Sequence, residues 1–197
     1  MRRYKCRRQT RETDVRIDLN VDGSGRFRIT TPLGFFNHLM ESFTRHGMFD
    51  LKLRADGDLH VDQHHFVEDC GEALGQAFFG ATSAGSNIRR SGCFAFPMDE
   101  SLAVVAVDIA GRSYVQYHAE FRRRFCGDLD TDVMEDFFHG FSRGLAANVA
   151  IRIPCGRSDH HKLEAMFKAF GRALDMACGS GPDLRIRRLS VKGEVRS

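Results

Sequence analysis

The sequence contains one five-residue pattern twice, and this repeat limits the folds that the chain can adopt. The pattern His-His-x-x-Glu occurs at residues 64–68 and again at residues 160–164, which is 96 positions later in a chain of 197 residues. Each copy, called a block below, opens a stretch of helical hydrophobic pattern in the same register. Chance readily gives one His-His pair, but rarely two with Glu at the same offset. The repeat therefore predicts two copies of one structural unit.

The spacing within each block suits metal binding if the block is helical. On an α-helix, positions i and i+4 share a face, whereas positions i and i+1 diverge by about 100°. His64 and Glu68 can therefore bind one metal ion together, as can His160 and Glu164, while the second His of each block points in another direction. Imidazole and carboxylate ligands suit manganese, iron or zinc. The alternative is two surface helices whose His side chains are merely solvated.

The rest of the hydrophobic pattern predicts the same order of elements in both halves. The first half is predicted as a strand, a turn, a return strand, a helix, a strand and the first block helix, at about residues 15–21, 22–25, 27–29, 35–43, 49–55 and 63–80. The second half repeats the two strands, the helix, the strand and the block helix, at residues 102–109, 114–118, 133–141, 149–153 and up to about 178. The stretch 81–97 is predicted to join the halves.

These elements predict an α/β (α+β) fold of two tandem ββαβα half-domains related by a pseudo-twofold axis. Two helices in each half need an apolar surface to cover, and a four-stranded sheet provides one. The first half-domain is expected at residues 1–88, and the second, with a basic C-terminal tail, at residues 89–197. Nothing between them has the composition of a flexible linker, so we expect one compact unit.

Overlaying the halves exposes one more pair of candidate ligands. His38 and Asp136 fall at equivalent positions of the two shorter helices, 26 and 24 residues before the blocks. Both side chains are possible ligands of a hard metal ion. The alternative for Asp136 is a solvated helix residue.

Composition and charge narrow the class of protein. The chain is 42% hydrophobic and can bury a core. A net charge of +3 is too small for a nucleic-acid footprint, but it suits a small anionic substrate. The six cysteines form no CxxC pair and are expected to be free thiols. No signal-like segment opens the chain and no apolar run reaches membrane length, so we expect a cytoplasmic protein without a membrane or nucleic-acid partner.

Together, the motifs resemble those of the imidazoleglycerol-phosphate dehydratase family of histidine biosynthesis. The resemblance covers nearly the whole chain and rests on residues 10–13, 34–38, 45–47, 57–58, 62–69, 96–100, 108–112, 159–164, 167–169 and 190–193. The chain has no segment for the phosphatase to which some relatives are fused, so a monofunctional form is expected.

The resemblance implies a manganese enzyme with two Mn²⁺ ions per active site. Its metal ligands correspond to His38, His64, His65, Glu68, His160, His161 and Glu164, and the overlay of the halves adds Asp136. Because the second His of a block diverges from the first, one helix can serve two different metal ions. The family forms a cage-like homo-oligomer of 24 subunits with sites shared between subunits, a state that the resemblance alone implies.

The implied reaction is the dehydration of imidazoleglycerol phosphate, a small phosphorylated imidazole, to imidazole acetol phosphate. A metal-bound imidazolate would expel the hydroxyl group to give a diazafulvene, and loss of a side-chain proton would give the enol of the product. The candidate acid–base groups are Glu12, Glu68 and Glu164. The implied substrate-binding residues are Glu12, His46, Arg90, Arg112, Ser190 and Lys192, of which the last four match phosphate-binding positions. Any of these basic residues could instead be solvated.

Several residues depart from the family pattern outside the blocks. These are Thr31-Pro32, Asn37, Asp136, Ala150 and Ser158. An Asp beside a ligand His raises its basicity, whereas Asn carries no charge. Two other readings stay open, the first because of these departures and the second because paired metal ions can also activate water. One is a catalytically impaired, metal-binding and cage-forming relative, and the other is a metallohydrolase that activates water.

Overall fold

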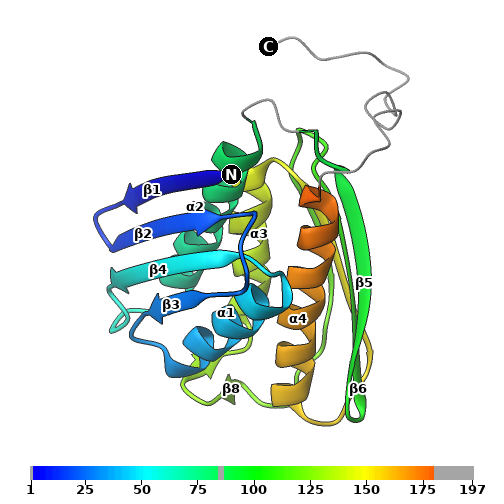
Figure 1. Cartoon of the computed structure of the whole chain (residues 1–197). Helices are drawn as coiled ribbons and strands as arrows, with labels where there is room; N and C mark the ends of the chain where they lie inside the picture. The colour runs from blue at the N-terminus through cyan, green and yellow to red at the C-terminus, as the bar shows by residue number, and fades with distance from the viewer. Residues whose placement is uncertain (1, 84–86, 180–197) are drawn as a thin grey trace.

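The computed structural model describes residues 2–83 and 87–179, and in this part of the chain four helices lie between two four-stranded sheets (Figure 1). The first half contains β1 (Arg3–Gln9), β2 (Thr13–Asn20), β3 (Phe27–Thr30), α1 (Gly34–His46), β4 (Asp50–Gly57) and α2 (His64–Ser83). The second half contains β5 (Ser91–Met98), β6 (Ser101–Asp108), β7 (Tyr114–His118), β8 (Phe125–Cys126), β9 (Leu129–Asp130), α3 (Val133–Leu145), β10 (Asn148–Cys155) and α4 (Asp159–Cys178).

The two large sheets have the same topology. Their strand orders are β1-β2-β4-β3 and β5-β6-β10-β7, and in each the last pair is parallel while the other pairs are antiparallel. Helices α1 and α2 cover the first sheet, and α3 and α4 cover the second. The predicted fold of two tandem α/β half-domains is therefore confirmed.

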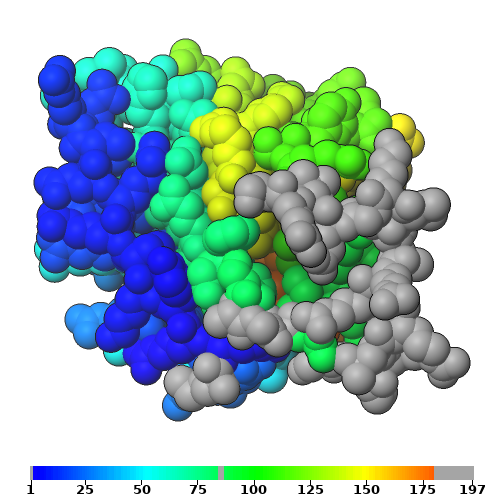
Figure 2. All heavy atoms as spheres, turned by 90° about the horizontal axis from the view of Figure 1, so that it is seen from above, coloured from blue at the N-terminus to red at the C-terminus, as the bar shows by residue number. Residues whose placement is uncertain are grey.

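The halves join through their helices. Helix α2 packs along α3, and α1 packs against α4, so the two helical layers meet in the middle of the molecule. Viewed from above, α2 and α3 lie side by side between the strands of the two halves (Figure 2). The proposed boundary at residue 88 falls between α2 and β5.

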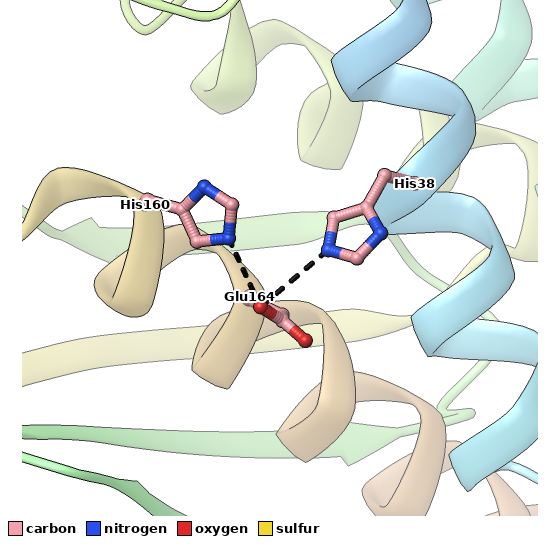
Figure 3. A group of neighbouring side chains, drawn as sticks. All are labelled: His38, His160 and Glu164. Carbon is pink, nitrogen blue, oxygen red and sulfur yellow. Dashed lines mark ion pairs between the residues drawn. The ribbon is translucent and has the colours of Figure 1, made fainter.

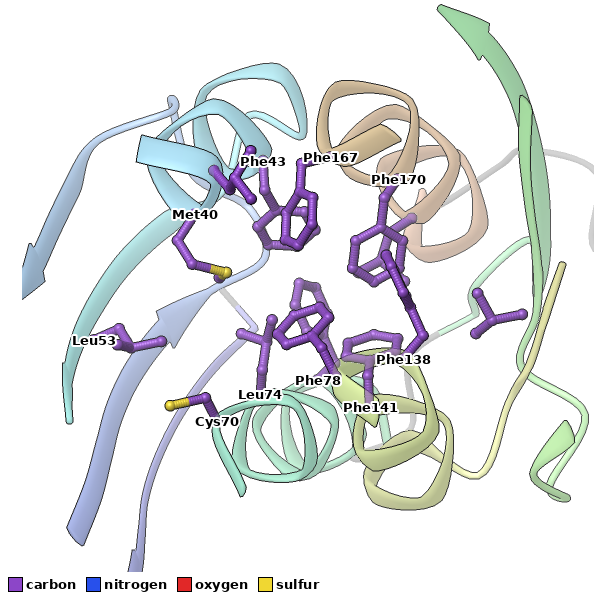
Figure 4. Packing of buried hydrophobic residues seen from close by; sticks show 14 of the residues in the cluster. Met40, Phe43, Leu53, Cys70, Leu74, Phe78, Phe138, Phe141, Phe167 and Phe170 are labelled. Carbon is purple, nitrogen blue, oxygen red and sulfur yellow. The ribbon is translucent and has the colours of Figure 1, made fainter. Parts of the chain in front are cut away.

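Phenylalanine rings fill the space between the helical layers. The i, i+1, i+4, i+5, i+8 spacing puts Phe43 of α1 and Phe141 of α3 on inward faces, where both meet Phe170 of α4, with ring centroids 5.0 and 4.8 Å away (Figure 4). Gly71 of α2 lets α3 approach closely, because a Cβ atom at this position would lie 2.1 Å from the carbonyl oxygen of Phe137.

Two strands and one type of connection differ from the sequence prediction. All but the last residue of strand β5 lies in the stretch 81–97 that was expected to be a connection, and β1 was not predicted at all. Both are sheet edges without a clean alternation of apolar and polar residues. The predicted return strands do not form hairpins. Instead β4 and β10, whose alternate residues are buried, lie between the expected partners, so that β3 and β7 pair with them in parallel.

The six cysteines are free, as the sequence predicts. Burial raises the pKa of the Cys178 thiol to about 12, which keeps it protonated and unreactive at neutral pH. Among the described helices, none is both long and apolar enough to cross a membrane.

Candidate metal centres

Three possible ligands converge where α1 crosses the start of α4. We call His38, His160 and Glu164 the α1/α4 group (Figure 3). Oε2 of Glu164 lies 3.4 Å from Nε2 of His38 and 3.2 Å from Nε2 of His160. All three side chains offer atoms within 4.8 Å of one another. The predicted i, i+4 pairing of the second block is thus present, and His38 joins it from the other half of the chain.

The carboxylate of the α1/α4 group is held in its ionised form. Its side chain is only 11% exposed, and burial by itself raises the pKa of Glu164. The hydrogen bond from Lys168, at 2.8 Å, and the neighbouring His38 outweigh burial and lower the pKa below its usual value. An ionised oxygen between two imidazole rings is a ligand set for a divalent cation.

His38 provides the test of whether the group fits a metal ion. Its Nε2 atom is buried and forms no hydrogen bond with any described residue, because the contact with Glu164 lacks hydrogen-bond geometry. A buried polar atom without a partner costs about 1–3 kcal/mol. A cation bound by Nε2 would remove that cost, so the arrangement fits a metal ion.

A second group occupies the equivalent place between α2 and α3. We call His64, Glu68 and Asp136 the α2/α3 group. Nδ1 of His64 lies 3.0 Å from Oδ2 of Asp136, and Glu68 has a ligand atom within 4.8 Å of His64. Glu68 also accepts a hydrogen bond of 2.8 Å from Arg143. The predicted equivalence of His38 and Asp136 is borne out in position, since each faces the block of the helix beside it.

The second His of each block behaves differently. His161 turns away from the α1/α4 group, and its Nδ1 lies 2.9 Å from Oε2 of Glu100. This hydrogen bond raises the pKa of His161 and lowers the pKa of Glu100 to about 2. His65 diverges less than the helical spacing predicts: its ring is at 88° to that of His64, yet a nitrogen of His65 stays within 4.8 Å of ligand atoms of His64 and Glu68.

The small β8–β9 hairpin fixes the ends of the helices that carry these groups. Asp128 in its turn accepts hydrogen bonds from the backbone N–H groups of Gly34 and Phe35 at the start of α1. Gln63, just before α2, bonds to the backbone of Asp128 and Asp130. The hairpin thereby holds the starts of α1 and α2 together and leads directly into α3.

Two of the predicted substrate-binding residues lie near these groups. Oε2 of Glu12, in the turn between β1 and β2, is 3.9 Å from Nε2 of His65, and its side chain is 55% exposed. His46 ends α1, and its ring meets Phe96 at 5.1 Å. Burial, together with Lys168 and Arg172, lowers the pKa of His46, so it is neutral at pH 7.

Of the predicted phosphate-binding residues, Arg90 lies far from the α1/α4 group. Arg90 makes a two-pronged ion pair with Asp108, at 2.7 and 3.0 Å, and its backbone N–H bonds to Ala177 near the end of α4. Seventeen residues of helix separate Ala177 from His160, which is roughly 25 Å at 1.5 Å per residue. Arg112 is exposed in the loop after β6. Ser190 and Lys192 lie outside the described residues.

The residues that depart from the family pattern can now be placed in the structure. Asn37 and Ser158 make local hydrogen bonds, and Ala150 lies in a strand. Asn37 both donates to the carbonyl oxygen of Thr31 and accepts from its N–H group, at 3.0 Å each, which an ionised Asp could not do. Ser158 caps α4 by accepting from the N–H group of His161. Ala150 lies in β10, between β6 and β7 and beside Ala106.

Sequence reasoning missed three polar residues of these sites. Lys168 could have been found, because it follows Glu164 at the i+4 spacing of a helical ion pair. Arg143 and Glu100 come from other elements and become partners only through the fold.

A basic cavity of about 570 Å³ lies beside His160. It is lined by Arg122, Arg123, Phe125, Cys126, Gly127, Arg157, Ser158, Asp159 and His160.

Known proteins are similar to this chain in both sequence and fold. Residues 31–174 match the family described as imidazoleglycerol-phosphate dehydratase. The imidazoleglycerol-phosphate dehydratase of Koribacter versatilis (strain Ellin345) is 52% identical over 98% of this chain and 99% of its own. That of Lachnoclostridium phytofermentans is 46% identical over 98% of both chains. A crystal structure of the Staphylococcus aureus N315 enzyme superposes with a TM-score of 0.81 at 34% identity, covering 91% of this chain and 99% of that one. The structure of the Pyrococcus furiosus enzyme in complex with (S)-C348 gives 0.79 at 29%, covering 90% and 95%.

Proposed function

The chain belongs to the imidazoleglycerol-phosphate dehydratase family, and we propose that it dehydrates imidazoleglycerol phosphate with divalent metal ions held by its two His-His-x-x-Glu blocks. The dehydration and its place in histidine biosynthesis follow from family membership. The observation that supports the metal dependence is the convergence of His38, His160 and Glu164, in which the buried Nε2 of His38 has no hydrogen bond to any described residue.

Each group offers its own set of ligands. The α1/α4 group supplies two imidazoles and a carboxylate, and the α2/α3 group supplies one imidazole and two carboxylates. His65 and His161 are the remaining imidazole ligands. We propose two Mn²⁺ ions per active site, because mixed nitrogen and oxygen donors suit this metal. When bound, the metal ions stabilise the deprotonated form of a coordinating group such as the substrate's ring.

The carboxylates of the protein have two different roles, namely binding the metal ions and transferring protons. Glu164 and Glu68 are engaged by Lys168 and Arg143, which suits them to bind a cation as carboxylates. Glu12 has no comparable cationic partner among the described residues, and it projects from a turn beside His65. We propose that Glu12 carries a proton to or from the substrate during loss of water. Glu68 and Glu164 remain the alternative carriers.

The placement of Arg90 supports a site shared between subunits. Arg90 lies near the end of α4, whereas the α1/α4 group lies at its start, a separation of roughly 25 Å. One small substrate cannot span that distance. We therefore propose that Arg90, Arg112, Ser190 and Lys192 bind the phosphate of a substrate held at another subunit's metal ions, with His46 as a further substrate contact.

The outer faces of the two sheets differ in a way that supports assembly. The outward residues of β2 in the first sheet are charged, namely Asp14, Arg16 and Asp18, whereas those of β6 in the second sheet are Leu102, Val104 and Ala106. A half-exposed apolar sheet face suits contact with another subunit. We propose a homo-oligomer of 24 subunits, each a single catalytic unit of the two halves 1–88 and 89–197. The free cysteines fit a location in the cytoplasm.

A product assay tests this function. Purified protein loaded with Mn²⁺ is incubated with imidazoleglycerol phosphate, and the enol or ketone product is followed by ultraviolet absorbance. We expect turnover by the wild type, at least about 100-fold less by Glu164→Gln, and unchanged turnover by Glu135→Gln, whose side chain is 52% exposed. Substrate binding without product would instead favour the impaired relative, and full activity of Glu164→Gln would refute the role of the second block.

A further inference from the structure

Both carboxylate oxygens of Glu100 accept hydrogen bonds from the start of α4 and the two residues just before it. Oε2 lies 2.9 Å from Nδ1 of His161. Oε1 accepts the backbone N–H groups of Ser158, at 2.7 Å, and Arg157, at 3.2 Å. Glu100 sits in the tight turn between β5 and β6, so the sheet fixes the carboxylate in place. The neighbouring Asp99 is 76% exposed, and its nearest oxygen is 3.7 Å from the same nitrogen.

This contact determines which nitrogen of His161 carries the proton. An ionised carboxylate only accepts hydrogen bonds, so Nδ1 must be the donor. In the neutral ring, Nε2 then has the free lone pair, and it points away from Glu100 on the other side of the imidazole. A metal ion binds a His nitrogen through that lone pair. The contact therefore leaves Nε2 of His161 free to bind a metal ion on the side of the ring that faces away from Glu100.

The equivalent carboxylate of the first half is placed differently. Glu12 lies in the turn between β1 and β2, as Glu100 lies in the turn between β5 and β6. Nε2 of His65 is 3.9 Å from Glu12, beyond hydrogen-bond distance, and the Glu12 side chain is 55% exposed against 34% for Glu100. The same position of the repeat thus holds a fixed carboxylate in one half and a free one in the other.

We propose that Glu100 is a positioning residue that holds His161 in the tautomer and orientation in which its Nε2 ligates a metal ion, while its counterpart Glu12 stays free for proton transfer. This inference rests on the proposed metal-dependent function. Asp99, Glu100 and His161 do not form a metal site of their own, because the oxygens of Glu100 already accept four hydrogen bonds, from Ser101, Arg157, Ser158 and His161. Glu100 acts only through His161 and does not touch the substrate.

The variant Glu100→Gln tests the proposal. It keeps the shape of the side chain but replaces one of the two acceptor oxygens with a hydrogen-bond donor, the amide NH₂ group. The backbone N–H groups of Arg157 and Ser158 need an acceptor, so the amide oxygen of Gln would take the place of Oε1. The NH₂ group would then face Nδ1 of His161. That arrangement favours the tautomer with hydrogen on Nε2, which cannot ligate a metal ion. Asp99→Asn makes the same chemical change one residue away at a mostly exposed side chain, and it is the matched control.

The measurement is titration of the metal-free proteins with Mn²⁺, with thermal melting and oligomeric state recorded in parallel. We expect the wild type and Asp99→Asn to bind two Mn²⁺ per chain alike. In Glu100→Gln we expect one of the two sites to weaken about 10- to 100-fold while the melting temperature of the metal-free protein is unchanged.

The outcomes separate this inference from the proposed function. If the wild type binds no Mn²⁺, the proposed metal dependence fails. If the wild type binds two Mn²⁺ and Glu100→Gln binds them equally well, the proposal for Glu100 is wrong. Should Glu100→Gln not fold, a crystal structure of the wild type with Mn²⁺ decides: Nε2 of His161 on the metal and Nδ1 on Glu100 is expected, and Nδ1 on the metal overturns the proposal.

Discussion

Nε2 of His38 in α1 lies 3.4 Å from Oε2 of Glu164 in α4, and it is buried without a hydrogen bond to any described residue. The two residues come from different halves of the chain, 126 positions apart. Neither half alone can assemble this ligand pair. Packing of α1 against α4 is therefore a condition for the site as well as for the core.

Replacing His38 should weaken metal binding without lowering the stability of the metal-free protein. His38→Leu removes a buried polar atom that lacks a partner, so the metal-free variant should melt no lower than the wild type. Mn²⁺ should raise the melting temperature of the wild type and do so less in the variant, because binding to the folded state stabilises it. His139→Leu, at a 45% exposed His of α3, is the control. An equal response of all three proteins to Mn²⁺ would contradict the role of His38.

Asp136 should make the α2/α3 group the more oxygen-rich of the two sites. It faces His64 at 3.0 Å, where the repeat places a His in the other half. Asp136→Asn keeps the size but removes the charge, and it should lower Mn²⁺ affinity at one site roughly tenfold. Asp136→His should retain a site but shift its preference from Mn²⁺ towards Zn²⁺, because imidazole is the softer ligand. Competition titrations measure both effects, and unchanged Mn²⁺ binding by Asp136→Asn would make Asp136 a solvated residue.

The sequence predicted the helices and most of the candidate ligands that the structure brings together, because both depend on local spacing. His160 and Glu164 are four residues apart on one helix, and the Phe43 and Phe141 positions follow the same hydrophobic period. Overlaying the repeats was enough to find His38 and Asp136. Local spacing does not specify which strands are neighbours, so the hairpins were predicted where β4 and β10 intervene.

The residues that the sequence did not reveal act across elements. The role of Glu100 depends on β5, which the sequence did not predict. With β5 a strand, the turn between β5 and β6 that holds Glu100 corresponds to the turn between β1 and β2 that holds Glu12. The large distance between Arg90 and the α1/α4 group also depends on the direction of β5 along α4. The sequence motifs indicated Arg90 as a phosphate-binding residue but could not show that it lies far from the α1/α4 group.

The close packing of α2 on α3 should not tolerate a side chain at Gly71. A Cβ atom there would lie 2.1 Å from the carbonyl oxygen of Phe137, so Gly71→Ala must push the helices apart. We expect a loss of about 3 kcal/mol in the free energy of unfolding. Gly34→Ala is the control, since its Cβ would meet Asp128 only at 3.4 Å. Denaturant unfolding measures both, and equal stability of the two variants would refute the close approach.

Asp50 should contribute stability that is lost in acid. Its carboxylate pairs with Arg26 at 2.8 Å and accepts the backbone N–H group of Ser24, and these contacts lower its pKa below the ordinary 3.8. A lowered pKa in the folded state means that the contribution is present above pH 3.8 and fades as the pH falls further. Asp50→Asn should therefore cost about 1 kcal/mol at pH 7 and progressively less below pH 3.8. Melting curves across pH, with Asp99→Asn as control, test this; a pH-independent difference would contradict it.

The most direct test of the account is an activity titration of the metal-free enzyme. Protein stripped with a chelator is assayed for dehydration of imidazoleglycerol phosphate while Mn²⁺ is added in known equivalents per chain. We predict no turnover without metal and a rise in rate that levels off at two equivalents per chain, one for each His-His-x-x-Glu block. Full turnover by the metal-free enzyme would contradict the claim that these blocks hold the metal ions on which the reaction depends.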